Sequence, residues 1–200
     1  MAIINKIDVV NSLLQKNNGV FDTAHATMAG VSKPTLSRLV KDGVLERIAH
    51  GKYIGLDAFP DELFILQQRS KKIIFSHETA LFLHDLSERT PMLHSLTIPS
   101  DRKLSPSLAD GCKVFYVKPE LHSLGICSLP SKMGQEVKVY NIERTICDVM
   151  RSRNRIDSQT VAEALKGYAA RKSVNWNLLN EYARIFSVIK LMRQYLEVLI

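Results

Sequence analysis

The fold is decided by the stretch MAGVSKPTLSRLVKDGVLERIAHGKYIGL, residues 28–56. Ser32 is a favoured helix N-cap residue, and Pro34 follows it in the first helical turn, where backbone amides have no partner within the helix. Gly43 suits the end of the same helix, because glycine adopts the left-handed backbone conformation without strain. These signals predict a short helix over residues 33–41.

A short hairpin pattern follows this helix directly. Leu45–Ala49 and Lys52–Leu56 predict two strands, and His50-Gly51 between them predicts a tight turn. Basic side chains lie on both sides of this turn. A hairpin of this kind directly after a helix is typical of a wing that lies along nucleic acid.

The residues upstream complete the pattern. Helices are expected over residues 5–16 and 23–29, from their apolar periodicity and stop signals. Val20 and Phe21 are expected to form a short apolar link between them. Helix, helix, turn, helix and hairpin, in this order, predict a winged helix-turn-helix over residues 1–57.

The helix over residues 33–41 divides into two faces. At 100° per residue, Leu36, Leu39 and Val40 point one way and pack on the two preceding helices, whereas Arg38 and Lys41 point the opposite way. Arginine can donate to two acceptors on guanine in the major groove, and residues at a helix start can hold phosphates. The candidate DNA-contacting residues are Lys33, Thr35, Ser37, Arg38 and Lys41 on this recognition helix and Arg47, His50 and Lys52 on the wing.

Two other interpretations of this region stay open at this point. A small amphipathic helix with basic residues outside is the commonest kind of surface helix. Winged helices also serve as modules for protein contact. The conjunction of cap, proline, basic front and basic hairpin favours DNA.

The rest of the chain predicts a second, larger domain. Residues 57–60 read as a boundary, and residues 58–74 as a connecting helix that leads into a domain over 75–200. There we expect strands over 95–98, 113–117 and 137–140 and helices over 76–86, 141–150, 157–171 and 175 to the end. The fold class is therefore α+β: an N-terminal winged helix-turn-helix followed by a larger mixed α/β C-terminal domain with C-terminal helices.

Composition and charge set outer limits on function. The net charge is +7, which makes an acidic partner such as nucleic acid worth considering. Residues 1–57 hold seven Lys and Arg against five Asp and Glu, and residues 58–200 hold 20 against 15, so the surplus is +2 and +5. No apolar run approaches 18 residues and no signal peptide is visible, so we expect a cytoplasmic protein without a membrane partner.

Catalytic and cofactor signatures are weak, and we expect no enzyme, no cofactor, no metal and no catalytic residue. SHETALFLH, from Ser76, invites comparison with the zinc motif H-E-x-x-H, but Leu81 stands where the second histidine belongs. Cys112, Cys127 and Cys147 are widely spaced and indicate reduced, mostly buried thiols. An enzyme hypothesis would use Cys147 or the His77-Glu78 region to reverse a chemical modification.

Four segments, taken in order, resemble a known family. They are GVSKPTLSRLVKDGVLERIAHGKYI from Gly30, FSHETALFLHDLSERTP from Phe75, LTIPSDRK from Leu96 and YNIERTICDVMR from Tyr140. The chain resembles the AbiEi-family antitoxins, above all the streptococcal ones, of bacterial type IV toxin–antitoxin and phage abortive-infection systems. The resemblance covers most of the chain.

The resemblance implies a function. It implies an autorepressor that binds inverted repeats in its own promoter, as cooperatively bound monomers or as a dimer. It also implies an antitoxin that counters a nucleotidyltransferase-like toxin without forming a stable complex with it. The alternative is a winged-helix module that sequesters a partner toxin directly. A further basic surface that could extend DNA contact or touch RNA comprises Arg69, Lys71, Lys72, Arg102, Lys103, Arg151, Arg153 and Arg155.

Overall fold

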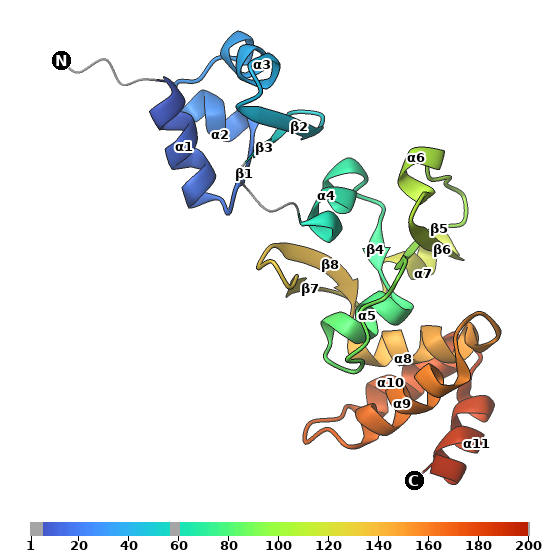
Figure 1. The fold of residues 1–200 in the computed structure, drawn as a ribbon. Coiled ribbons are helices and arrows are strands. Elements are labelled where there is room, and N and C mark those ends of the chain that lie inside the picture. Colours follow the sequence, from blue (N-terminus) through green and yellow to red (C-terminus); the bar gives the residue numbers. More distant parts are fainter. Residues whose placement is uncertain (1–5, 57–60, 200) are drawn as a thin grey trace. The chain divides into compact units, whose positions relative to one another are not determined.

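The structure is a computed structural model that describes residues 6–56 and 61–199 (Figure 1). Asn5, where the first helix is expected to begin, and residues 57–60, where a domain boundary is expected, lie outside the described residues.

The described chain divides into two units, each with its own core. The first unit contains the described residues up to Lys71 together with Met133–Gln135. The second unit contains Lys72–Lys132 and the described residues from Glu136 onward. The first core gathers around Leu36 and the second around helix-borne side chains such as Ile146.

The first unit combines helices with a small sheet. Its elements are α1 (Lys6–Lys16), β1 (Val20–Asp22), α2 (Thr23–Met28), α3 (Lys33–Lys41), β2 (Leu45–Ala49), β3 (Lys52–Gly55) and α4 (Glu62–Arg69). The antiparallel strands lie in the order β1-β3-β2. The helices of residues 6–41 followed by the β2–β3 hairpin confirm the winged helix-turn-helix.

The expectation of an apolar link at Val20 and Phe21 is wrong, because both residues belong to strand β1. Val20 pairs with Ile54, and Phe21 pairs with Tyr53, with the two ring centroids 5.7 Å apart. Three residues are too few to show strand periodicity in sequence. Their pairing with β3 makes them a strand.

The second unit is built on a five-stranded mixed sheet. Its elements are β4 (Ile74–Phe75), α5 (His77–Leu83), β5 (His94–Pro99), α6 (Pro106–Ala109), β6 (Cys112–Val117), α7 (Pro119–His122), β7 (Ile126–Pro130), β8 (Glu136–Tyr140), α8 (Ile142–Arg151), the 3-10 helix η1 (Arg153–Arg155), α9 (Ser158–Ala169), α10 (Trp176–Ile185) and α11 (Ile189–Leu199). The strand order is β6-β5-β4-β8-β7, with β5–β6 and β4–β8 parallel and the other two pairs antiparallel.

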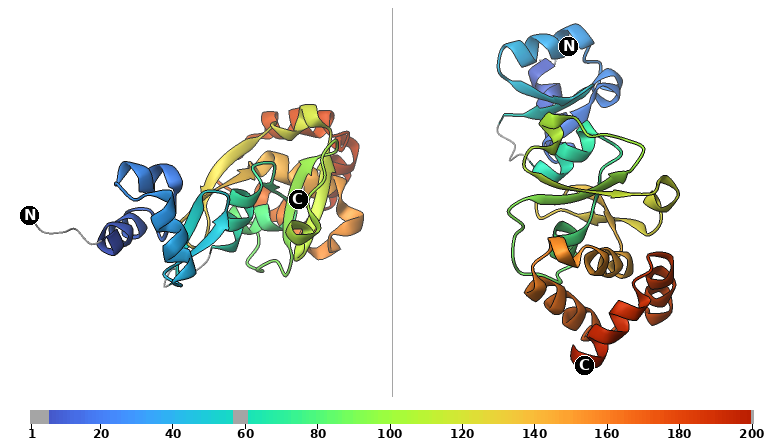
Figure 2. Two further views of the ribbon diagram at one scale, coloured as in Figure 1. Left: turned by 90° about the horizontal axis from the view of Figure 1, so that it is seen from above. Right: turned by 90° about the vertical axis from the view of Figure 1, so that its right-hand side faces the viewer.

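Helices cover the sheet of this unit. Figure 2 shows α8 to α11 gathered as a helical layer beyond the sheet, with α5 between them and the strands. Leu81 of α5 and Val117 of β6 share one core with Ile146, Leu165 and Leu179 of the helical layer. Mixed helices and sheet after a winged helix confirm the α+β class.

Two expected helices are shorter in the structure. The helix expected over residues 76–86 ends at Leu83, since Asp85 adopts a φ of 54°. The helix expected from residue 175 to the end is broken into α10 and α11, because Ser187 adopts a φ of 57° and the amide of Val188 donates to the carbonyl of Ala183 at 2.8 Å. No glycine marks either stop, which is why the sequence did not show it.

Candidate nucleic-acid interface

Helix α3 is held by an apolar inner face. Leu36 and Leu39 are 0% and 3% exposed, and Val40 packs against the same cluster, which includes Val10 of α1 and Ala26 of α2. The predicted inner face is therefore confirmed. Burial on α1 and α2 fixes the angle at which the opposite face of α3 meets solvent.

The start of α3 is capped as predicted. The Ser32 hydroxyl accepts a hydrogen bond from the amide of Thr35 at 3.3 Å, and the two side-chain oxygens lie 2.9 Å apart. Pro34 stands in the first turn. The Thr35 side chain is therefore engaged with the cap and only half exposed, whereas Lys33 beside it is exposed.

The outer face of α3 carries uncompensated positive charge. Lys33, Ser37, Arg38 and Lys41 are all exposed. Among the salt bridges of the described residues, none involves Lys33, Arg38 or Lys41. These three cations are thus available to phosphates or base edges.

The wing brings Arg47 and His50 together and diverts Lys52. An Arg47 Nη2 lies 3.1 Å from Nδ1 of His50, and Arg47 Nε donates to the carbonyl of Ala49 at 3.3 Å. Lys52 pairs with Asp22 on the neighbouring strand β1 at 3.5 Å. Hydrogen bonding from the amide of His25, together with Lys52, holds the pKa of Asp22 below its usual value, so this carboxylate offsets the charge of Lys52.

One cation near α3 was not found from the sequence. Lys6 Nζ donates to the carbonyl of Gly30 at 2.9 Å, so the start of α1 is placed beside the turn that leads into α3. No sequence signal links residues 24 positions apart. The fold, and not any local sequence pattern, therefore places Lys6 beside the start of the recognition helix.

The further basic residues fall into separate groups. Arg69 ends α4 and Lys71 follows it in the first unit, while Lys72 begins the second. The remaining residues belong to the second unit: Arg102 and Lys103 are exposed after β5, and Arg151, Arg153 and Arg155 lie at the end of α8 and on η1.

Several of these cations also contact other groups within the second unit. Arg102 pairs with Asp101 at 3.3 Å. Arg151 lies 3.6 Å from Asp148, and Arg155 lies over the Phe115 ring, 4.3 Å from its centroid. Lys103 and Arg153 are exposed.

The residues considered for catalysis are poorly placed for it. Burial raises the pKa of the Cys147 thiol to about 12, so this sulfur is held as a thiol and not as the nucleophilic thiolate. His77 is fully buried against Ser76 and Ser152, with its ring stacked 3.5 Å from that of Phe115. Ser76, which directly precedes α5, makes no side-chain cap bond to that helix and instead accepts a hydrogen bond from Thr97 Oγ1.

The family comparison matches the unit that this geometry singles out. Residues 8–54 match the family described as "Transcriptional regulator, AbiEi antitoxin". The matched residues lie in the first unit. Over residues 8–54 this match confirms the resemblance inferred from the sequence, and these residues include α3 and the candidate residues of the wing. The matched family is one of regulators and not of enzymes.

Comparison of structures covers more of the chain than residues 8–54. The chain is similar to the crystal structure of the RV2827C protein from Mycobacterium tuberculosis, with a TM-score of 0.54 and 12% sequence identity. The similarity covers 94% of this chain and 79% of that one, and it concerns the fold. No curated protein matches the sequence. None of the described helices is both long and apolar enough to cross a membrane.

Proposed function

We propose that this AbiEi-type regulator binds inverted repeats in its own promoter and represses its operon. We further propose that it counters a nucleotidyltransferase-like toxin without forming a stable complex with it. The observation that carries the DNA-binding part is the outer face of α3. Lys33, Arg38 and Lys41 are exposed there and unpaired by the described carboxylates, on a helix fixed from behind by buried leucines.

The roles follow from position on the helix. Arg38 lies in the middle of the exposed face, where a guanidinium can donate to O6 and N7 of a guanine. Lys33 lies at the start and Lys41 at the end of α3, where they hold phosphates on either side of the groove. The Arg47–His50 pair at the wing contacts the adjacent sugar–phosphate backbone of the DNA.

The test is binding to the DNA just upstream of the gene, measured by fluorescence anisotropy at two salt concentrations with a scrambled duplex as competitor. We expect the promoter to be preferred by about a thousandfold or more, and binding to weaken with salt. Arg38→Ala should reduce promoter affinity by about 1–3 kcal/mol and relax the preference over scrambled DNA. Changing one repeat at a time then distinguishes a dimer from cooperatively bound monomers.

Lys16→Ala is the matched control. Lys16 is an exposed cation at the end of α1, and Lys6 at the other end of that helix is the one that reaches the entry of α3. This variant should bind the promoter like the wild type. Equal binding by Arg38→Ala and Lys16→Ala would remove Arg38 from the groove.

The antitoxin part is tested separately, with the toxin expressed from an unrelated promoter. Arg38→Ala should still rescue growth, because repression and antitoxicity then rest on different surfaces. Purification of the toxin with this chain in near-equal amounts would instead favour direct sequestration, the alternative function.

A further inference from the structure

A cavity in the second unit contains none of the candidate DNA-contacting residues of α3 and the wing. Its volume is about 410 Å³, within the range of about 300–1,000 Å³ for ligand pockets. Its lining residues are Ser100, Tyr116, Val117, Lys118, Leu121, Arg151, Ile185, Phe186 and Ser187.

The cavity lies at a favourable place in the sheet. β5 and β6 are parallel neighbours, and Ser100 and Lys118 are the residues that directly follow them. The amide of Ser100 donates to the carbonyl of Val117 at 2.8 Å, which keeps the two strand ends together. In open α/β sheets, ligands bind in the crevice beyond the carboxyl ends of parallel strands, and the β5–β6 pair has this local arrangement.

A buried arginine fixes the walls. Arg144 is 0% exposed, and its guanidinium carbon lies 4.0 Å from the centroid of the Phe186 ring. Its Nη1 donates to the carbonyls of Leu121 and Leu124 at 3.0 and 3.1 Å. Leu121 and Phe186 are both wall residues, so Arg144 ties together two parts of the lining that come from different elements of the chain.

The lining is positively charged. Arg151 and Lys118 line the cavity, and none of the described lining residues is acidic. Asp148 does not line the cavity but is the carboxyl partner of Arg151. It lies 2.9 Å from Arg144 and 3.6 Å from Arg151. Two guanidinium groups share one carboxyl group, so positive charge is left over whether or not Asp148 is ionised.

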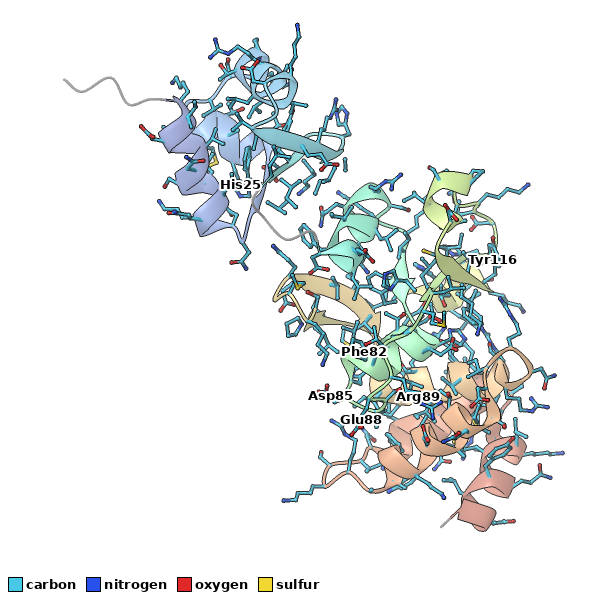
Figure 3. All side chains as sticks on the ribbon, in the orientation of Figure 1. His25, Phe82, Asp85, Glu88, Arg89 and Tyr116 are labelled. Atoms are coloured by element: carbon cyan, nitrogen blue, oxygen red, sulfur yellow. The ribbon has the colours of Figure 1, made fainter. Side chains whose placement is uncertain are left out.

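The lining is also aromatic and apolar at the rim. Tyr116 is 52% exposed and Ile185 is 40% exposed, so both side chains are accessible to a ligand. Figure 3 labels Tyr116 on β6, at the edge of the sheet. A flat apolar surface beside cations and serine hydroxyls matches a ligand with a planar ring system at one end and a phosphate at the other.

We propose that this cavity binds a nucleotide, with its phosphate at Arg151 and Lys118 and its base against the exposed ring of Tyr116. A free nucleotide and the terminal nucleotide of a single-stranded RNA present the same chemistry. The nucleotide site does not depend on promoter recognition by α3. The proposal would therefore still hold if the protein did not bind its promoter.

The site is tested by titrating the ¹⁵N-labelled full chain with ATP in the absence of divalent metal, with a single-stranded oligoadenylate, and with inorganic phosphate. We expect amide shifts at Lys118 and Ser187 with ATP or the oligoadenylate, and the tighter of the two identifies the source. Shifts confined to other residues, no binding at millimolar ATP and oligoadenylate, or equal binding of inorganic phosphate would overturn the proposal.

Variants assign the binding energy. By calorimetry, Lys118→Glu should weaken binding of the tighter probe by about tenfold or more, because a charge-assisted contact is replaced by repulsion. Tyr116→Ala should weaken it by about five- to a hundredfold through lost stacking, while Tyr116→Phe retains it. Thermal unfolding of each variant checks that the second unit is intact.

Lys190→Glu is the matched control. Lys190 is exposed on α11 and does not line the cavity, and its substitution by Glu changes the net charge by the same amount as Lys118→Glu. It should bind the probe like the wild type. Equal weakening by Lys190→Glu and Lys118→Glu would mean that net charge, and not the cavity, attracts the ligand. Displacement of the probe by polyglutamate as effectively as by unlabelled nucleotide would likewise reject a nucleotide site in favour of an acidic-peptide site.

Discussion

Arg38 in the first unit and Arg144 in the second both lie on amphipathic helices, yet they are used in opposite ways. Arg38 is exposed on α3 and has no salt bridge among the described residues. Arg144 on α8 is fully buried between the rings of Tyr140 and Phe186, and its Nε donates to Asp148 at 2.9 Å. The difference teaches that a surplus of basic residues is not by itself a basic surface.

The same contrast holds for the units as wholes. The C-terminal part carries the larger surplus of positive charge. One of its arginines, Arg144, is buried and connects α8 to α7 and to the α10–α11 turn. The winged helix has the smaller surplus and displays it on one helix face. Changes at arginine should therefore affect binding in one unit and stability in the other.

The largest expected effect is on stability, from Arg144→Ala. Removing one partner of a buried ion pair leaves Asp148 buried without its main counter-charge, which costs about 3–5 kcal/mol. Trp176, the one tryptophan of the sequence, lies in α10 and packs edge-on to Tyr168, so its fluorescence reports unfolding of this unit in urea.

Two comparisons sharpen this prediction. Arg38→Ala should change the same urea transition by less than about 0.5 kcal/mol, because its side chain is exposed. The double variant Arg144→Met/Asp148→Leu should lose less free energy of unfolding than Arg144→Ala alone, since neither partner of the pair is left buried with a charge. An Arg144→Ala protein as stable as Arg38→Ala would break the contrast between the two arginines.

A smaller effect is expected from pH, again confined to the second unit. Burial and, after it, the charges of Arg151 and Arg144 hold the pKa of His77 well below 6.5. In the unfolded chain His77 takes up a proton below about pH 6.5, whereas the folded chain does not. Stability should therefore fall as the pH drops below about 6.5, by up to about 1.4 kcal/mol per pH unit.

Urea unfolding followed through Trp176 at pH 7.0, 6.0 and 5.0 measures this slope. Burial also lowers the pKa of His84 and His122, so these residues add to the slope in the same direction. His77→Asn should flatten the slope, because asparagine tolerates the φ of 46° at this position and does not titrate. An unchanged slope in this variant would assign the acid sensitivity to other groups.

The smallest expected effect is local to α3. Ser32→Ala removes the cap bond to the Thr35 amide and should destabilise the winged helix by about 1 kcal/mol. Amide hydrogen exchange of α3 measures the loss. Ser12→Ala, an exposed serine within α1, is the control and should leave exchange of α3 unchanged. Equal effects of the two changes would show that the cap does not stabilise the helix.

Much of the first unit could be predicted from sequence because its signals are local. Ser32, Pro34 and Gly43 mark the ends of α3, and its leucines mark the buried face. The sequence did not predict β1, β4 or β7, because their short or weak patterns become strands only by pairing with a neighbouring strand of the sheet. The proposed DNA-contacting residues stay a prediction, although the fold displays Lys33, Arg38 and Lys41 on one face.

By itself, the sequence determined the order of elements in the winged helix and the capping of α3, since caps, turns and apolar spacing act within a few residues along the chain. The tertiary structure alone decided which cations face solvent. It placed Lys6 beside Gly30, paired Lys52 with Asp22, and enclosed Arg144 behind a cavity wall. Burial and charge pairing depend on residues distant in sequence, and so no local pattern records them.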